Sequence, residues 1–554
     1  MSAVSLKTIL LLDYRNRGAA TTQSSGNLGD QVQTVAMMRI VKKWLNIWDT
    51  VHGRKGLPNN TLNVATCPRD EHVHFHSADA FVIMYGWYMH RAASGMYAFP
   101  PLTDKVIATS FHVSNDAILT STAVEYLCRI GPVGCRDLST LQKLRARHVP
   151  SFYSGCVTLT LPPAPIDRPR YGSIAVDTVS PDPKAIHIAM WSVGNRLLTQ
   201  RQMWLRALCV LRLLRRSAMV YSSRLHVLYP CLAMGTPAMI QSPTGDTRSD
   251  WGPPGRWETA RLYASGNRNY KQDAKRLESQ LAVALGNILT GGINVTSAWR
   301  KAVIVHIAFC FDSGFVIPTL ACANSLLIHN GERPLMLHFF YRNVLPSDIS
   351  TMRQRLLTRH PGTMLQFYPC EGDNIAISGY STHLSHVSVQ TMERLWLHRK
   401  LLDIDRLIYI DGDMIIRGSL DYLFNLRVPV IAARNSVENI MLSEKWNRGL
   451  RFTGDSCFNA GLMVMNLAAL RRMDFTSFVQ KVLAVQGCND QTILNLFCQG
   501  QHIRLPPQYN YFAREPSDIT SNVNPIIIHY CGSQKPWNAK NVHMGEEWWK
   551  YQLT

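Results

Sequence analysis

Two parts of the chain each begin with a run of apolar residues that ends in an aspartate. The first run is KTILLLD at 7–13, and the second is KAVIVHIAFCFD at 301–312. Runs that are apolar at nearly every position are typical of strands buried on both faces of a parallel sheet. Similar short runs alternate with helical patterns in both parts, among them AFVIMYG, SIAVD, RLIYID and NPIIIHY. The pattern predicts an α/β protein with largely parallel sheets.

A polar stretch that contains glycine, LTGGINVTS, separates the two parts and ends at Ser297. With 554 residues, the chain is several times longer than a common domain. We therefore expect two domains, residues 1–294 and residues 295–554. A long loop is predicted from Gln241 to Gly255, because Pro, Gly, Asp and Ser dominate there and no apolar period survives.

Positive charge is the main feature of the composition. The net charge is +20 and the hydrophobic fraction is 46%. These values indicate a globular protein that attracts anionic partners such as nucleotides, phosphates, acidic glycans or anionic lipid. The densest basic run, 206–216, has the spacing of an amphipathic helix, which we favour over an anion-binding patch. Because no basic and aromatic surface motif accompanies the charge, we do not expect a nucleic-acid partner.

Cysteine usage and hydropathy bear on the compartment. The 13 cysteines include no CxxC pair and have no regular spacing, which favours reduced thiols over a disulfide framework or a zinc ribbon. No run approaches the roughly 18 apolar residues of a membrane span, and the short run at 9–12 does not have the form of a targeting segment. We expect a cytoplasmic protein without a membrane span, and peripheral association with a membrane stays open.

An acidic pair follows one of the predicted strands. The apolar run RLIYI ends at Ile410 and leads into Asp411, Gly412 and Asp413. Two carboxylates at the end of a strand suit a hard divalent cation that bridges the phosphates of a nucleotide, and the glycine allows close approach. Because D-x-D is also common in solvated turns, the sequence around it decides between the two interpretations.

The chain from residue 301 onward resembles the glycogenin-like and galactosyltransferase-like family of retaining glycosyltransferases. Six motifs match in order: AFCFDSGFVIPTLACANSLL, ERLWLHRKLLDIDRLIYIDGDMII, CFNAGLMVMNL, CNDQTILN, RLPPQYN and HYCGSQKPW. The resemblance implies a GT-A type α/β domain that transfers a hexose from a UDP-sugar to a glycan acceptor with retention. It also implies Mn²⁺, or another divalent cation, as cofactor.

The resemblance assigns the metal ligands as Asp411, Asp413 and His529. Two carboxylates and an imidazole suit Mn²⁺, which accepts oxygen and nitrogen ligands and leaves positions for diphosphate oxygens.

The same resemblance assigns the residues that contact the donor: Asp312, Arg394, Asn459, Gly532 and Lys535. A glycine permits backbone approach, an ammonium neutralises the leaving group, and the planar fork of an arginine holds phosphate or sugar oxygens. Asp490 and Gln491 are the catalytic candidates, since a carboxylate or amide oxygen stabilises an oxocarbenium-like centre. Many relatives carry two acidic residues after the first strand, where this chain has Phe311 and Asp312.

The first part of the chain resembles the polysaccharide pyruvyl transferase family over roughly residues 5–290. The motifs are DAFVIMYGWYMHR, KVIATSFH, GPVGCRDLSTLQKL and VYSSRLHVLYPCLAMGTPAMI. The resemblance implies a two-lobed, Rossmann-like (GT-B-like) fold and transfer of pyruvate from phosphoenolpyruvate to a sugar. Arg224 and His226 match the family motif, because arginine clamps carboxylate or phosphate and histidine transfers protons. Arg136, in GCRD, is a second basic candidate or an ordinary ion-pair partner.

Alternatives for the first part stay open. Val227 replaces the small residue that often follows the histidine, so a degenerate module that binds glycan or acts as a scaffold is the rival to a second enzyme. The segment 26–30, GNLGD, predicts either an anion-binding loop before a helix or a plain turn. His72, His74 and His76 would share one face of a strand and suit zinc, but we favour an exposed strand or loop.

Overall fold

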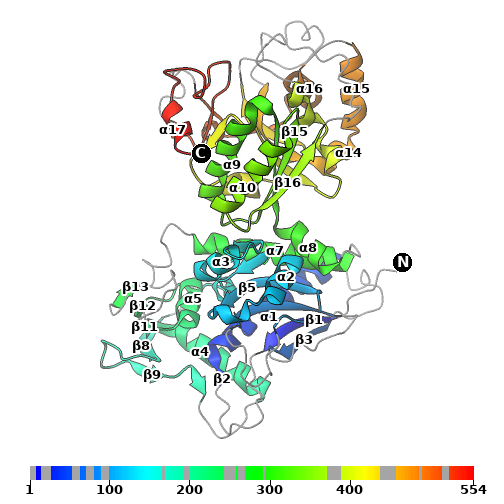
Figure 1. Cartoon of the computed structure of the whole chain (residues 1–554). Coiled ribbons are helices and arrows are strands. Elements are labelled where there is room, and N and C mark those ends of the chain that lie inside the picture. The colour runs from blue at the N-terminus through cyan, green and yellow to red at the C-terminus, as the bar shows by residue number, and fades with distance from the viewer. Residues whose placement is uncertain are drawn as a thin grey trace. The chain divides into compact units, whose positions relative to one another are not determined.

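The computed structural model shows two compact units, Met1–Val303 and Ile304–Thr554, and each is described by itself (Figure 1). The structure describes residues 8–13, 26–52, 63–69, 80–88, 99–164, 169–192, 199–241, 257–259, 269–290, 294–370, 389–436, 457–485, 489–513 and 523–553. The three histidines at 72, 74 and 76 and the predicted loop beyond Gln241 lie outside the described residues.

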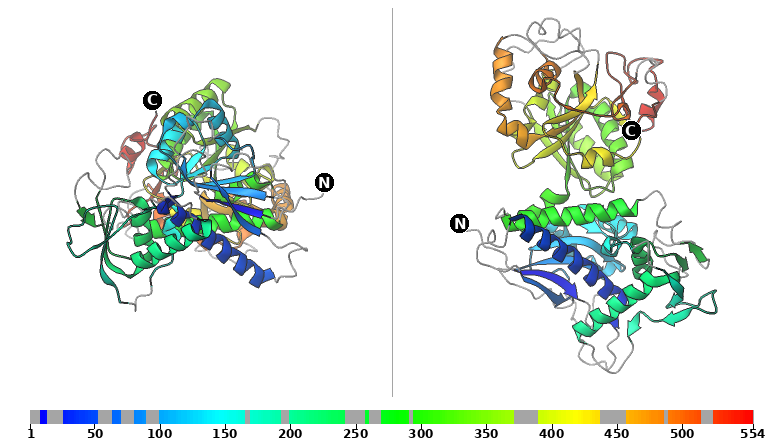
Figure 2. Two further views of the ribbon diagram at one scale, coloured as in Figure 1. Left: turned by 90° about the horizontal axis from the view of Figure 1, so that it is seen from below. Right: turned by 180° about the vertical axis from the view of Figure 1, so that it is seen from behind.

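The first unit contains a six-stranded parallel sheet with the order β3-β1-β4-β5-β6-β7. Its strands are β1 (Thr8–Asp13), β3 (Asn63–Pro68), β4 (Ala80–Tyr88), β5 (Val106–Val113), β6 (Val133–Cys135) and β7 (Ser151–Tyr153). Every residue of β5 is buried, as expected for a strand covered on both faces. The helices of this part are α1 (Leu28–His52), α2 (Ser121–Ile130), α3 (Leu138–Arg145), α7 (Tyr270–Thr290) and α8 (Val295–Val303). Figure 2 shows α1 lying across the sheet.

A second sheet in the same unit has the order β13-β12-β11-β8-β9. The strands are β8 (Tyr171–Val176), β9 (Ile186–Ile188), β11 (Ser217–Ser222), β12 (Ala238–Gln241) and β13 (Trp257–Thr259). All pairs are parallel except β12 with β13. Helix α4 (Gln200–Arg216) begins with a capping box between Thr199 and Gln202, and α5 (Leu225–Met234) follows β11. The predicted helix over 206–216 is confirmed.

The segment 26–30 differs from both alternatives considered for it. Gly26 and Asn27 form β2, which pairs with β10 (Trp191–Ser192), and α1 already begins at Leu28. Gly29 and Asp30 therefore lie in the first turn of the helix rather than in a loop before it. The pairing partner is far away in the sequence, so local turn chemistry did not reveal it.

The second unit is built on a seven-stranded sheet with the order β16-β15-β14-β17-β20-β19-β21. The strands are β14 (Val305–Asp312), β15 (Leu335–Arg342), β16 (Met364–Pro369), β17 (Arg406–Ile410), β19 (Ile431–Asn435), β20 (Phe458–Asn466) and β21 (Ile503–Arg504). The expectation of largely parallel strands is wrong for part of this sheet, because β20 runs antiparallel to both β17 and β19. Strand β20 is buried on both faces, so its apolar run does not indicate whether the strand runs parallel or antiparallel to its neighbours.

A small sheet completes the second unit: β18 (Met414–Ile416), β23 (Ile527–His529) and β22 (Tyr511–Phe512). The helices are α9 (Val316–Asn330), α10 (Pro346–Arg359), α11 (Leu397–Lys400), α12 (Asp421–Asn425), α14 (Leu467–Arg472), α15 (Phe475–Val485), α16 (Asp490–Cys498) and α17 (Gly545–Trp549). Separate apolar clusters contain alternate residues of β17: Ile408 and Ile410 belong to one, Leu407 and Tyr409 to the other. The sheet is therefore buried on both faces, and its strand ends form the edge where the predicted site lies.

Two further observations concern the whole described chain. The 12 cysteines within it are all free thiols. Among the described residues, no helix combines the length and the apolar character that crossing a bilayer requires.

Candidate active site

Strand β17 delivers the acidic pair, as predicted, and β18 brings it to a histidine. Asp411 and Asp413 lie in the turn between these strands, and β18 pairs antiparallel with β23 so that Met414 lies opposite His529. The backbone N–H of Asp411 donates to the carbonyl of Gly461 at 2.8 Å. One side-chain ligand atom of each of Asp411, Asp413 and His529 lies within 4.8 Å of the others. Residues more than a hundred positions apart thus form one cluster.

A buried asparagine orients the histidine. The Nδ1 atom of His529 lies 2.9 Å from Oδ1 of Asn510, which is fully buried. The amide of Asn510 also donates to Oδ1 of Asn459 at 3.1 Å, which leaves its own Oδ1 to accept. This arrangement assigns the ring proton to Nδ1 and turns the lone pair of Nε2 toward Asp413, whose Oδ1 is 3.3 Å away.

The residues present fit a divalent cation. Oδ1 of Asp413 is buried and has no hydrogen-bond partner, so it offers a lone pair to a ligand. Gly461 keeps space open beside the cluster: a Cβ there would lie 2.5 Å from Cε1 of His529 and 2.9 Å from Oδ2 of Asp411. Two carboxylates and one imidazole nitrogen suit a metal that accepts both oxygen and nitrogen ligands.

A buried arginine connects this cluster to the predicted catalytic residues. Nη2 of Arg394 lies 2.9 Å from Oδ1 of Asp411, and its Nε lies 3.0 Å from Oδ2 of Asp490. The guanidinium stacks over the ring of Tyr409 at 4.5 Å, and the Tyr409 hydroxyl donates to Asp411 at 2.6 Å. Burial opposes the charge on Arg394, but both aspartates raise its pKa above the ordinary value. Arg394 therefore acts as a fixed cation between two carboxylates.

The two carboxyl groups of the pair have opposite pKa shifts. Burial works against the charge on Asp413, but the ammonium of Lys535 holds its pKa well below the usual range. Nζ of Lys535 donates to Oδ2 of Asp413 and to the carbonyl of Tyr530, both at 2.5 Å. Burial raises the pKa of Asp411, against the attraction of Arg394, and the nearby charge of Asp413 adds to the rise. The pair thus holds one firmly ionised carboxylate.

The remaining predicted residues lie around this centre. Asp312 ends β14 and accepts a hydrogen bond from the N–H of Gly314 at 3.1 Å. The ring of Phe315, from the same turn, lies 6.0 Å from Nζ of Lys535. Oε1 of Gln491 accepts from the N–H of Ala460 at 2.8 Å. The last donor candidate, Gly532, has a φ of 94°, which favours glycine.

Three residues of this site were not singled out in the sequence: Tyr409, Gly461 and Asn510. Each belongs to a motif that carries the resemblance, so their positions were signalled but their roles were not. Tyr409 points from the strand toward Asp411, and Asn510 acts through His529.

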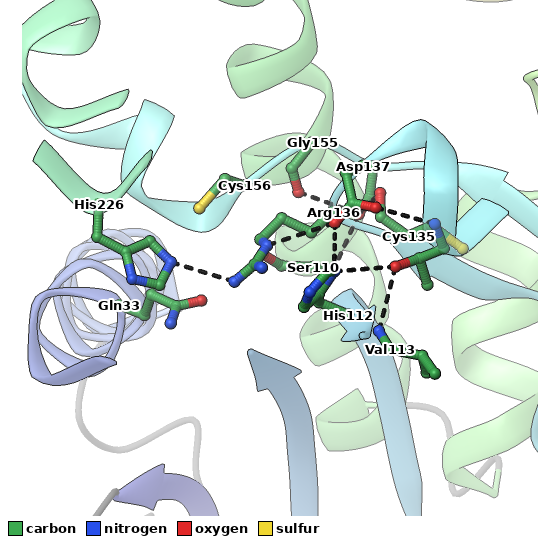
Figure 3. Close-up of polar contacts among 12 residues, drawn as sticks. Gln33, Ser110, His112, Val113, Cys135, Arg136, Asp137, Gly155, Cys156 and His226 are labelled. Atoms are coloured by element: carbon green, nitrogen blue, oxygen red, sulfur yellow. Dashed lines mark hydrogen bonds and ion pairs between the residues drawn. The ribbon is translucent and has the colours of Figure 1, made fainter. Parts of the chain in front are cut away.

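The first unit contains a second polar cluster, shown in Figure 3. Nη1 of Arg136, which follows β6, lies 3.1 Å from Nε2 of His226 in the first turn of α5. The other ring nitrogen of His226 is 3.8 Å from Oδ1 of Asp30 in α1. The amide of Gln33, one turn further along α1, donates to the same oxygen at 3.2 Å. The structure therefore brings together His226 and Arg136, two residues 90 positions apart.

Two buried polar atoms of this cluster lack a hydrogen-bond partner: Nε of Arg136 and Oε1 of Gln33. Arg136 is backed by Asp137, whose Oδ2 lies 3.6 Å from Nε of Arg136 and 2.5 Å from Nδ1 of His112. Although burial opposes it, the contacts with His112 and Arg136 lower the pKa of Asp137. Arg224 forms an ion pair with Asp177 at 3.0 Å.

Comparison with known proteins identifies the second unit. Residues 306–541 match the family model "Glycosyl transferase family 8". The chain is 25% identical over 267 residues to glycosyltransferase GlyF of Streptococcus pneumoniae, covering 46% of this chain and 61% of that protein. It is 26% identical over 255 residues to a putative glycosyltransferase of Haemophilus influenzae, covering 43% of this chain and 75% of that protein. The galactosyltransferase LgtC structure matches with 21% identity and a TM-score of 0.39, over 45% of this chain and 97% of LgtC.

The matched region contains the whole Asp411–Asp413–His529 cluster together with Arg394, Asp490 and Lys535. Residues 306–541 are therefore a family 8 glycosyltransferase region.

Proposed function

We propose that the second unit transfers a hexose from a UDP-sugar to a glycan acceptor with retention of configuration. The observation that carries this proposal is the position of the Asp411–Asp413–His529 cluster inside the family 8 region. A cluster of two carboxylates and an imidazole, with one buried carboxylate oxygen that accepts no hydrogen bond, suits a divalent cation such as Mn²⁺.

The cation would be held by Asp411, Asp413 and His529, and when bound it would neutralise charge on the diphosphate of the donor. Lys535 adds a second positive charge beside Asp413, where it would stabilise the departing UDP. The φ of 94° at Gly532 lets the backbone approach the diphosphate closely. Asp312 would contact the uracil base from the end of β14.

The donor sugar would lie against Asn459, Asp490 and Gln491. Asp490 is 4% exposed, so its carboxylate would act in a region with little water, where a negative charge strongly stabilises an oxocarbenium-like centre. The ion pair with Arg394 positions this carboxylate. Arg394 would act through Asp411 and Asp490 as much as through the donor itself.

The test is release of UDP by the purified full-length protein from a panel of UDP-sugars, with and without Mn²⁺. We expect metal-dependent release with one of these sugars and its loss in Asp413→Asn, which removes one charge with little change of shape. Release that does not depend on metal, or that survives in Asp413→Asn, would contradict the proposed site. Anomeric analysis of the product tests retention, and an inverted product would refute that part.

A second function, transfer of pyruvate from phosphoenolpyruvate to a sugar, is favoured in the first unit by one observation. The contact between Arg136 and His226, with unpartnered polar atoms around it, suits a small anion and a proton transfer. Two sugar hydroxyls would add to the enol carbon, and the bond from this carbon to the phosphate oxygen would break. One hydroxyl proton would pass to the methylene carbon, and the other would leave with inorganic phosphate. Arg224 is the further candidate for contacting the anion.

Phosphoenolpyruvate-dependent mass gain of a glycan acceptor, with release of phosphate, tests this second function. We expect both signals to disappear in the double variant Arg224→Ala/His226→Ala. Unchanged sugar transfer with no pyruvylation by the wild-type protein would instead support a binding or scaffold module.

A further inference from the structure

Helix α4 of the first unit is apolar on two faces. One face packs against the unit and consists of Met203, Ala207, Val210, Leu211 and Leu214. The other face exposes Leu205, Leu208 and Leu213, whose exposed fractions are 53%, 39% and 47%. Because the buried face already has the usual helical spacing, the exposed leucines are not needed to attach this helix to its unit.

Arginines share the exposed face with these leucines. The helix sequence QRQMWLRALCVLRLLRR contains five arginines and no acidic residue. The exposed arginines are Arg201, Arg206, Arg212 and Arg216. At about 100° per residue, Arg212 projects between Leu208 and Leu205 around the helix axis. The exposed face is therefore an alternation of guanidinium groups and apolar side chains.

We propose that this face of α4 binds the surface of an anionic lipid bilayer. Guanidinium groups would pair with headgroup phosphates, while the leucines enter the boundary between headgroups and acyl chains. The net charge of +20 on the chain strengthens the attraction to such a surface. The proposal does not depend on the function proposed for either unit.

The leucines decide between a bilayer and a nucleic acid as the partner. A polyanion such as RNA would neutralise the arginines and leave three leucine side chains in water. A bilayer accepts both kinds of side chain. Single exposed leucines are normal on protein surfaces, but here three share one helix face with four arginines, and the helix lacks carboxylates.

The test is cosedimentation of the full-length protein with phosphatidylcholine vesicles, with and without phosphatidylglycerol. We expect binding to the anionic vesicles, weaker binding at high salt, and little binding to phosphatidylcholine. Arg201→Gln/Arg212→Gln should lower the apparent affinity about tenfold or more. Leu205→Ser/Leu208→Ser/Leu213→Ser should also lower it about tenfold.

The matched control lies on helix α7 of the same unit. Lys271 and Lys275 are exposed there, and Lys271→Gln/Lys275→Gln removes the same charge as the double arginine variant. We expect this control to bind vesicles like the wild type. Equal losses in the two charge variants would overturn the proposal, because overall charge would then explain binding. Wild-type binding by the leucine variant would overturn it too.

The exposed Cys209 supplies a direct probe of insertion. An environment-sensitive fluorophore on this thiol should shift its emission to the blue when anionic vesicles are added, and the label should be absent in Cys209→Ser. No shift at a lipid concentration that sediments the protein would overturn the proposal. Thermal unfolding of each variant, compared with wild type, separates loss of binding from loss of fold.

Discussion

Each unit has a buried arginine near the carboxyl end of a buried strand, since Arg136 follows β6 and Arg394 contacts Asp411 after β17. The two units balance the charge of this arginine differently. In the second unit, Arg394 lies between Asp411 and Asp490, and the surrounding cluster is rich in carboxylates. In the first unit, Arg136 contacts His226 and has one carboxylate beside it, Asp137, whose Oδ2 lies 3.6 Å from its Nε. An excess of carboxylates prepares a site for a cation, whereas an excess of donors prepares one for an anion. The difference predicts a cationic ligand at the site of the second unit and an anionic ligand at the site of the first.

Removing each arginine gives the largest contrast between the units. Arg394→Leu leaves the buried Asp490 and the half-buried Asp411 without their cation, which should lower the free energy of unfolding of the second unit by about 3–5 kcal/mol. Arg136→Leu should cost the first unit about 1–3 kcal/mol, because Asp137 keeps its contact with His112. Calorimetry of the full chain with a chelator present measures both. Equal losses would contradict the idea that the two arginines are balanced differently.

A glycine substitution tests the open space beside the proposed metal ligands. In Gly461→Ala, the new Cβ would crowd His529 and Asp411, so we expect UDP release to fall about a hundredfold, the upper end of the loss seen when residues around metal ligands are changed. Gly418→Ala is the matched control, since its Cβ would lie 3.7 Å from the Ile526 side chain, an ordinary contact. Isothermal titration with Mn²⁺ should show the same ranking. Full activity in Gly461→Ala would argue against a cation at this position.

Acidification should destabilise the second unit at a higher pH than the first. In the second unit, burial lowers the pKa of His306 to about 4 and of His338 to about 3, and their rings are hydrogen-bonded at 3.0 Å. In the unfolded chain these two histidines bind protons near pH 6.5, whereas in the folded unit they stay neutral to a lower pH. Above pH 6.5 they are neutral in both states, so they cost the folded unit no stability there. Stability falls as the pH drops from 6.5 toward 4, by up to about 1.4 kcal/mol per pH unit for each histidine. The lowered pKa of Asp137 costs the first unit stability only at a pH below about 4.

We therefore expect the second unit to open at a higher pH than the first. Hydrogen exchange read by mass spectrometry at a series of pH values assigns each opening to a unit. The double variant His306→Phe/His338→Phe should weaken the dependence between pH 6.5 and 4. Opening of the first unit at the higher pH would show that other groups dominate.

The smallest effect on stability is expected at Arg224 of the first unit. The side chain of Arg224 is 39% exposed in its ion pair with Asp177, so Arg224→Ala should change the free energy of unfolding by less than about 1 kcal/mol. Arg129→Ala, which breaks an exposed ion pair with Asp104, is the control for stability and should behave alike. If the first unit binds an anion, Arg224→Ala should weaken phosphoenolpyruvate binding and Arg129→Ala should not. Equal binding in both would remove Arg224 from the site.

The sequence predicts the acidic pair because its cause is local: an apolar strand ends and two aspartates follow. The amphipathic helix over 206–216 is predictable for the same reason, since its period of buried positions lies within one segment. The direction of β20 was not predictable, because a strand buried on both faces reads alike in either direction.

Contacts that depend on distant pairing were also beyond the sequence. The orientation of His529 is set by Asn510, which carries no recognisable chemistry in its own segment. The contact between Arg136 and His226 requires β6 and α5 to meet, and neither motif indicates which basic residue the histidine will contact. The sequence therefore predicts which residues belong to each candidate site better than it predicts which side chains those residues contact.

The pairing of β18 with β23 also has a consequence for synthesis on the ribosome. Asp411 and Asp413 emerge from the exit tunnel well before His529, whose strand lies opposite Met414. During that interval the nascent chain carries two neighbouring carboxylates without the imidazole that completes the cluster. The first unit has by then fully emerged and can fold as a separate domain. The Asp411–Asp413–His529 cluster is thus one of the last parts of the second unit to assemble.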